Sequence, residues 1–260
     1  AAALVPLVLS GCREAPQQPA PPAFQPTWES IRTHQVPQWY DEAKFGIFIH
    51  WGLYSVPAWA TPLGELGKVD WNVWFKNNPY AEWYLNSLRI EGSPTQKHHY
   101  ATYGKNFDYL DFIPRFNEAI ARWDPGAMAE FFASAGARYV VLTTKHHDGF
   151  TLWPSEVPNP NRRPDQRHAA RDIAGELTTA VKARGMRMGL YYSGGLDWSF
   201  TTQPIVKAEE VSGTIIHTPE YARCADAHWR ELIDRYQPDI LWNGNCLPPP
   251  RALSSPICLG

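Results

Sequence analysis

Four apolar, strand-like runs that alternate with helical segments constrain the fold of this chain more than any other feature. The runs are residues 45–52, 138–145, 187–193 and 239–243. Each is largely apolar through its middle, as expected for strands that are buried on both faces. Strands that alternate with helices are typical of βα units around a parallel sheet, so the sequence predicts an α/β fold.

The helices between the runs have clear start and stop signals. Asp124 provides an N-cap in front of Pro125, and Gly136 follows the end of that helix. Residues 172–184 form the next predicted helix, and Thr218 opens a third, in which apolar residues recur at helical spacing.

A long insertion, residues 53–123, follows the first strand and contains a predicted helix around residues 80–88. Barrel enzymes build their sites in the loops that follow strands. A closed barrel needs eight strands, so the four predicted strands indicate the first four βα units of a TIM-type (β/α)8 barrel. Residues 244–260 have neither helical nor strand period, and we expect an irregular tail or a disrupted reading frame.

The first residues have the pattern of an export signal. Residues 1–12 form an apolar run, too short to span a bilayer, that ends in Leu-Ser-Gly-Cys. This ending resembles a bacterial lipobox, in which the cysteine, here Cys12, is lipidated after cleavage. The start of the signal looks clipped. Residues 13–27 are a Pro-rich tether, so we expect an exported bacterial lipoprotein, in the periplasm or outer membrane, whose catalytic region covers residues 28–243.

Charge and cysteine content narrow the class of function. The net charge of -2 leaves no cationic face for phosphate backbones, so the sequence predicts no nucleic-acid partner. Cys224, Cys246 and Cys258 lack the CxxC spacing of zinc sites, and we infer no disulfide framework.

Polar and aromatic residues follow each predicted strand at the end where a barrel binds its substrate. These residues are His50-Trp51, His146-His147-Asp148, Tyr191-Tyr192 and Trp242-Asn243. Neighbouring histidines reach one ligand only if the backbone turns after the strand, and Gly149 permits such a turn. Neutral imidazoles with aromatic walls predict a sugar pocket.

Three histidines and Asp148 also allow a metal-site interpretation, since metal-dependent hydrolases use the same barrel end. The sequence has no HxH spacing, and the surrounding aromatic residues fit a sugar better than a metal. We therefore predict no metal and no other cofactor.

Several ordered motifs carry a resemblance to a known family. They are residues 45–52 (FGIFIHWG), residues 82–84 (EWY), residues 145–150 (KHHDGF) and residues 189–198 (GLYYSGGLDW). Together they resemble α-L-fucosidases of glycoside hydrolase family 29, from about residue 28 to residue 243.

The resemblance implies exo-hydrolysis of terminal α-L-fucose from a fucosylated glycan, with retention of configuration and without a cofactor. It places the sugar among His50, Glu82, Trp83, His146, His147 and, less directly, Tyr192. We add Trp242 as a substrate-binding candidate from the end of the fourth strand.

The catalytic carboxylates are where this sequence departs from the family. A retaining mechanism needs two carboxyl groups about 5 to 5.5 Å apart. The family places its nucleophilic Asp directly after the Leu-Trp-Asn of the fourth strand, where this chain has Gly244, and its acid/base lies further along than residue 260. Asp148 and Asp197 are better explained as turn or supporting residues, and Asp239 should lie at the opposite end of the sheet.

Three hypotheses follow. The first is an exported member of the α-L-fucosidase family that lacks turnover as written. The second is a non-catalytic fucose-binding lipoprotein or an inactive truncated fragment. The third is a metal-dependent hydrolase.

Overall fold

The computed structural model describes residues 24–25, 27–65 and 67–244. The chain divides into two units, Ala1–Gln35 and Val36–Gly260. In the first unit, α1 (Trp28–Ile31) begins after Thr27, whose side chain accepts a hydrogen bond from the Ser30 backbone N–H. The predicted export signal, Cys12, most of the tether and residues 245–260 lie outside the described residues.

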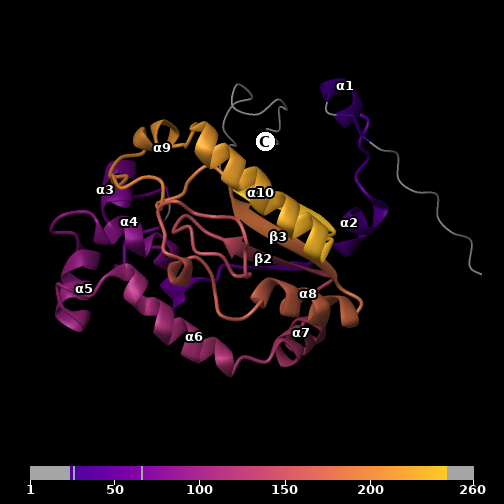
Figure 1. Cartoon of the computed structure of the whole chain (residues 1–260), viewed down its shortest axis with the longest axis horizontal. Coiled ribbons are helices and arrows are strands. Elements are labelled where there is room, and N and C mark those ends of the chain that lie inside the picture. Colours follow the sequence, from indigo (N-terminus) through magenta and orange to yellow (C-terminus); the bar gives the residue numbers. More distant parts are fainter. Residues whose placement is uncertain (1–23, 26, 66, 245–260) are drawn as a thin grey trace, which may run out of the picture. The chain divides into compact units, whose positions relative to one another are not determined.

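Four parallel strands organise the second unit (Figure 1). They are β1 (Gly46–Ile49), β2 (Tyr139–Lys145), β3 (Arg187–Ser193) and β4 (Ile240–Gly244), paired in chain order. The predicted parallel α/β arrangement is confirmed. The first strand is shorter than predicted, because it ends at Ile49. The fourth strand runs one residue beyond the predicted end at residue 243, because Gly244 pairs with Ser193 as the last residue of β4.

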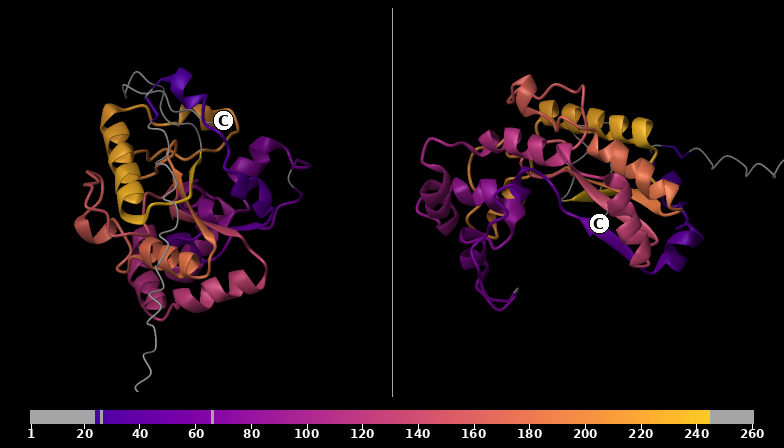
Figure 2. Two further views of the ribbon diagram at one scale, coloured as in Figure 1. Left: turned by 90° about the vertical axis from the view of Figure 1, so that its right-hand side faces the viewer. Right: turned by 90° about the horizontal axis from the view of Figure 1, so that it is seen from below.

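One face of the sheet packs against helices. α7 (Pro125–Ser134), α8 (Ile173–Ala183) and α10 (Pro219–Tyr236) supply this layer, which Figure 2 shows from two further sides. The strands contribute the completely buried residues Val140, Leu142, Met188 and Leu190 to the core between sheet and helices. Alternate residues of the same strands point to the other face, because the side-chain period of a strand is two.

The predicted helix starts are confirmed by their caps. The side chains of Asp124, Asp172 and Thr218 each accept a hydrogen bond from a backbone N–H in the first turn of α7, α8 and α10. Each cap satisfies one donor that the helix itself cannot. Gly136 follows α7 with a φ of +89°, a conformation that glycine adopts without strain.

The insertion after β1 is more helical than predicted. Its α-helices are α3 (Trp71–Lys76), α4 (Tyr84–Leu88), α5 (Pro94–Tyr103) and α6 (Ile113–Ala121). Its 3-10 turns are η1 (Leu53–Ser55), η2 (Ala81–Trp83) and η3 (Tyr109–Phe112). The helix predicted around residues 80–88 corresponds to η2 and α4. Figure 1 shows α3, α4 and α5 beyond the end of the sheet at which β2 and β3 terminate.

The sheet curves strongly across its four strands. The rings of Phe48 in β1 and Trp242 in β4 lie 5.4 Å apart, although two strands separate them. In a flat sheet with strands about 4.8 Å apart, these two backbones would be about 14 Å apart. The two edge strands are not buried on both faces as predicted: Phe48, Leu241 and Trp242 are 38%, 44% and 45% exposed.

Close approach of side chains on the inner face depends on a glycine in β3. A Cβ at Gly189 would lie 2.8 Å from Cγ2 of Val141 and 3.1 Å from Cβ of Ile240. Gly189→Ala should therefore destabilise the chain by about 1 to 3 kcal/mol through overpacking, measured by urea denaturation. Gly213→Ala is the matched control, because a Cβ there meets nothing within 4 Å. Equal stability of the two variants would contradict this account of the curved face.

Candidate sugar-binding site

Two neighbouring histidines follow β2 and lie together. The rings of His146 and His147 are 4.0 Å apart, and both residues are buried. The backbone turns directly after them, with the Gly149 N–H donating to the His146 carbonyl at 3.2 Å. Gly149 has a φ of +78°, and a Cβ there would lie 2.6 Å from Oδ1 of Asp197. The turn predicted at Gly149 is confirmed.

The residue that follows β1 and two residues of the insertion complete this cluster. Nδ1 of His50 lies 3.4 Å from Oε1 of Glu82, and its ring is 5.4 Å from that of His146. The ring of Trp83 meets His147 edge-on at 5.6 Å. The structure therefore brings together five of the predicted site residues from three separate parts of the chain.

Tyr192 does not belong to this cluster. Its completely buried side chain points to the helix side, where its hydroxyl lies 2.9 Å from Nδ1 of His228 in α10. Tyr191 lies at the site instead, with its ring 6.0 Å from His50 and 6.3 Å from His146. The structure thus does not bring the predicted Tyr192 to the histidine cluster. Strand alternation carries the missing signal, because Tyr191 lies two residues after Gly189 on the inner face.

Trp242 lies on the same inner face but toward its exposed side. It is paired with Tyr191 in the register of β3 and β4, and its ring contacts Phe48. Phe48 in turn lies 5.2 Å from the ring of His50. Trp242 therefore lines the inner face, and the ring of Phe48 lies between it and His50.

The carboxylates that follow β2 and β3 are held by internal partners. Asp148 accepts hydrogen bonds from the Tyr109 hydroxyl at 2.8 Å and from the Phe150 N–H at 3.0 Å. Asp197 lies 2.8 Å from Nζ of Lys145. Both carboxylates therefore support the turns, as the sequence indicated. Asp239 pairs with Arg187 at the first residue of β3, at the opposite end of the sheet.

Burial sets the charge of the site. Burial lowers the pKa of His146 well below its usual value, and the charges of His147 and His50 lower it further. The pKa of His147 falls to about 3, first through burial and then through the charge of Lys145. Burial, the largest single influence, raises the pKa of Glu82, but the hydrogen bond from His50, a backbone hydrogen bond and the charges of His146 and His50 together outweigh it and lower the pKa. At neutral pH, two uncharged imidazoles therefore lie beside one carboxylate.

Several buried polar atoms around the pair have no hydrogen-bond partner within the part of the chain that the structure describes. They are the Tyr54 hydroxyl, the Thr143 hydroxyl, Nδ1 of His146 and Nε1 of Trp198. The Tyr54 ring contacts His146, Trp198 contacts His147, and Thr143 is paired with Tyr191 in the sheet. Buried polar groups in native proteins are nearly always paired, so this cluster suits a ligand rich in hydroxyl groups.

Gly244 occupies the position at which the family resemblance places a nucleophile. A Cβ at this residue would lie 1.7 Å from the hydroxyl oxygen of Tyr191 and 2.3 Å from its Cζ. Any side chain at position 244 therefore requires that the ring of Tyr191 move.

Among residues 24–25, 27–65 and 67–244, no group of three His, Cys, Asp or Glu side chains has the arrangement of a metal site. Within the same residues, no helix is both long and apolar enough to cross a bilayer. Cys224 is a buried free thiol.

Comparison with known proteins assigns the family. The family profile described as Alpha-L-fucosidase matches residues 12–248. The chain belongs to the α-L-fucosidase family. Human tissue alpha-L-fucosidase is 36% identical over 256 residues, which cover 93% of this chain and 46% of that protein. The alpha-L-fucosidase of Dictyostelium discoideum is 37% identical and covers 84% of this chain and 43% of its own length.

Solved structures of α-L-fucosidases share the fold of this chain. The Thermotoga maritima alpha-fucosidase in complex with fucose has a TM-score of 0.77 and 50% identity, covering 87% of this chain and 50% of that one. An alpha-L-fucosynthase from Thermotoga maritima has a TM-score of 0.80 and 53% identity, covering 86% and 50%. The chain thus spans about half the length of the α-L-fucosidases that it matches.

Within the histidine cluster, Ser193 fixes which nitrogen of His147 carries the proton. The Ser193 hydroxyl donates to the Leu196 carbonyl at 3.0 Å, because a carbonyl can only accept. It has no second proton for Nδ1 of His147, 2.6 Å away, so Nδ1 must be the donor in that contact. Since the ring is neutral, Nε2 has a free lone pair and accepts hydrogen bonds. No pattern in the sequence indicates this role of Ser193.

We expect this arrangement to be visible by NMR of ¹⁵N-labelled imidazoles. In the wild-type chain at pH 7, Nδ1 of His147 should show the shift of a protonated nitrogen and Nε2 that of an unprotonated one. Ser193→Ala removes the acceptor and should mix the two tautomers, and Ser193→Thr should restore the single form. Ser134→Ala, at an exposed serine, is the control. A protonated Nε2 in the wild type would refute the assignment.

Proposed function

We propose that this chain forms the fucose-binding half of an α-L-fucosidase-type (β/α)8 barrel and holds a terminal α-L-fucose residue of a glycan. The four-stranded curved sheet supplies the first four βα units of such a barrel. His50, Glu82, Trp83, His146 and His147 would surround the sugar, with Tyr191 in place of Tyr192.

The observation that carries this proposal is the cluster of buried polar atoms around the histidine pair that find no partner among the described residues. A sugar hydroxyl both donates and accepts, so it can satisfy an acceptor and a donor at once. Nε2 of His147 and the Glu82 carboxylate offer acceptors, while the hydroxyl of Tyr54 can donate. Trp83 offers an apolar surface for the C–H groups of the ring.

We infer further that this chain binds fucose without hydrolysing it. A retaining mechanism requires a carboxylate to attack the anomeric carbon, and Gly244 has no side chain. Asp148 and Asp197 are engaged by Tyr109 and Lys145, which leaves neither as a ready nucleophile. The second candidate is an active retaining hydrolase, which family membership favours.

Turnover of p-nitrophenyl-α-L-fucoside separates the two candidates. The wild-type chain should release no p-nitrophenolate above the buffer rate. Gly244→Asp should release p-nitrophenolate, because the new carboxylate supplies the nucleophile once the Tyr191 ring has moved. Gly244→Asn has the same shape but no carboxylate, and it should remain inactive. Wild-type turnover that is lost on Asp148→Asn or Asp197→Asn would overturn the inference.

Binding is measured in the same samples by calorimetric titration with L-fucose. His146→Ala should weaken binding at least tenfold, since the ring lines the cluster. His168→Ala is the control, because its Nδ1 meets the carbonyl of Ala169 in the loop after β2. Absence of heat at millimolar fucose, in folded wild-type protein, would eliminate the sugar-binding proposal.

We also propose that the chain is exported and anchored to a membrane through lipid on Cys12. The support is the apolar run of residues 1–12 with its lipobox-like ending and the Pro-rich tether that follows. Expressed with a complete signal in a bacterium, the protein should partition with membranes and carry a diacylglycerol-modified N-terminal Cys12 by mass spectrometry. Cys12→Ala should leave it without lipid. An unmodified Cys12 in the wild type would exclude the anchor.

A further inference from the structure

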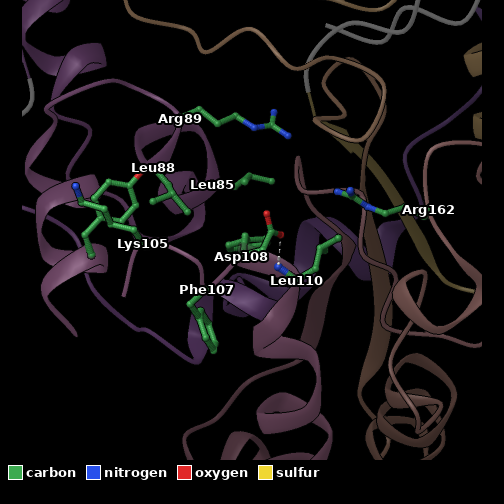
Figure 3. A pocket seen from close by; sticks show the side chains of 10 residues that line it. Leu85, Leu88, Arg89, Lys105, Phe107, Asp108, Leu110 and Arg162 are labelled. Carbon is green, nitrogen blue, oxygen red and sulfur yellow. Dashed lines mark hydrogen bonds between the residues drawn. The ribbon is translucent and has the colours of Figure 1, made fainter. Parts of the chain in front are cut away.

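A second pocket, separate from the histidine cluster, lies between the insertion and the loop after β2. Its volume is about 320 Å³. Its lining comes from the end of α4, from α5 and the turn before η3, and from Arg162 (Figure 3). None of the residues proposed to surround fucose lines it. A pocket of this size is at the lower end of those that hold small molecules, and it suits a single sugar unit.

The pocket carries more positive than negative charge. Arg89, Lys105 and Arg162 line it, against the single carboxylate of Asp108. Within the described part of the chain, none of these four side chains forms an ion pair. Charged groups are usually neutralised by a partner when they are partly withdrawn from water, as Arg89 and Arg162 are.

Both guanidinium groups are held in place by neutral carbonyl oxygens. Arg89 donates to the carbonyls of Thr201 and Trp198, each at 2.9 Å. Arg162 donates to the carbonyl of Asp148 at 3.1 Å. Burial lowers the pKa of Arg89, and the like charge of Arg162 lowers it further. Asp108 and Asp197 partly offset the charge of Arg89, but both cations are oriented in advance by neutral carbonyls rather than by a carboxylate in direct contact.

Figure 3 shows both guanidinium groups pointing toward the same space, with the Asp108 carboxylate below it. Guanidinium groups match the oxygens of carboxylate and sulfate groups through paired N–H donors. Asp108 repels a bare anion but accepts hydrogen bonds from hydroxyl groups. Its Oδ1 already accepts from the Leu110 N–H at 3.0 Å, which fixes the carboxylate.

We propose that this pocket binds an acidic sugar, with its carboxylate or sulfate between Arg89 and Arg162 and a hydroxyl group on Asp108. Leu85, Leu88 and Leu110 provide an apolar wall for the sugar ring. Lys105 adds charge at the exposed side. The proposal does not depend on fucose binding, because the two sites share no lining residue.

The test is a titration of the ¹⁵N-labelled chain, followed by two-dimensional NMR at constant ionic strength. The probes are D-glucuronate, glucose 6-sulfate, inorganic sulfate and neutral D-glucose. Glucuronate or glucose 6-sulfate should shift the amide signals of residues 85–89, 105–110 and 162 in a saturable way. The sugar that binds with the higher affinity shows whether the pocket prefers a carboxylate or a sulfate. Inorganic sulfate and glucose should bind at least tenfold more weakly.

Variants assign the binding to the two arginines. Arg162→Gln should weaken binding of the acidic sugar at least tenfold, and Lys105→Gln, at an exposed residue, should weaken it about threefold. Arg163→Gln is the matched control, because Arg163 is the next residue in the loop and pairs with Asp165. The proposal would be overturned if the Arg162 and Arg163 variants bound the acidic sugar with equal affinity. It would also be overturned if glucuronate, glucose 6-sulfate and glucose bound equally well, or if the shifted amide signals came from residues outside the pocket. L-fucose in the same series reports separately on the histidine cluster.

Discussion

A buried ion pair between Lys145 and Asp197 holds the site together. Nζ of Lys145 lies 2.8 Å from Oδ2 of Asp197, and the two side chains are 0% and 4% exposed. Such a pair is tolerated only when its remaining hydrogen-bonding groups are satisfied. Here Lys145 also donates to the Ser193 carbonyl, and Asp197 accepts from Ser199. The ion pair thereby links the end of β2 to the end of β3 and to the turn that follows it. His146 and His147 directly follow Lys145, so this link also fixes their position.

The same link controls the protonation of the histidines. The fixed charge of Lys145 adds to burial in lowering the pKa of His147 to about 3. In the unfolded chain the ring has a pKa near 6.5. Between these two values the unfolded state binds the extra proton, so His147 contributes stability fully above about pH 6.5 and loses it as the pH falls toward 3. A ring kept neutral in this way can present an unprotonated Nε2 to a hydroxyl group, which a charged ring cannot.

Sequence patterns predicted the helix-facing half of this structure better than its inner face. Apolar periodicity and caps such as Asp172 gave the helices, because both are local properties of the chain. His50, His146 and His147 were predicted because strand ends meet at one edge of a parallel sheet, whereas Glu82 and Trp83 were predicted from the family resemblance. The choice between Tyr191 and Tyr192 depended on the strand register, and the role of Ser193 depended on one hydrogen bond to Leu196. The insertion was only partly predicted, since its short helices are held by aromatic packing from distant residues.

Gly244 and Tyr191 are best understood as one structural unit. They lie on adjacent strands, and the Tyr191 ring takes the space that any Cβ at position 244 would need. The ring is also part of the aromatic contacts with Phe48 and His50. A carboxylate at position 244 therefore requires rearrangement of the inner face as well as a change of one residue. Conversely, glycine allows Tyr191 to pack beside the histidines, where burial raises its pKa to about 12 and keeps its hydroxyl protonated. The glycine at position 244 and the aromatic wall that Tyr191 forms beside the histidine cluster are therefore linked, because the tyrosine ring fills the space that a larger residue at 244 would need.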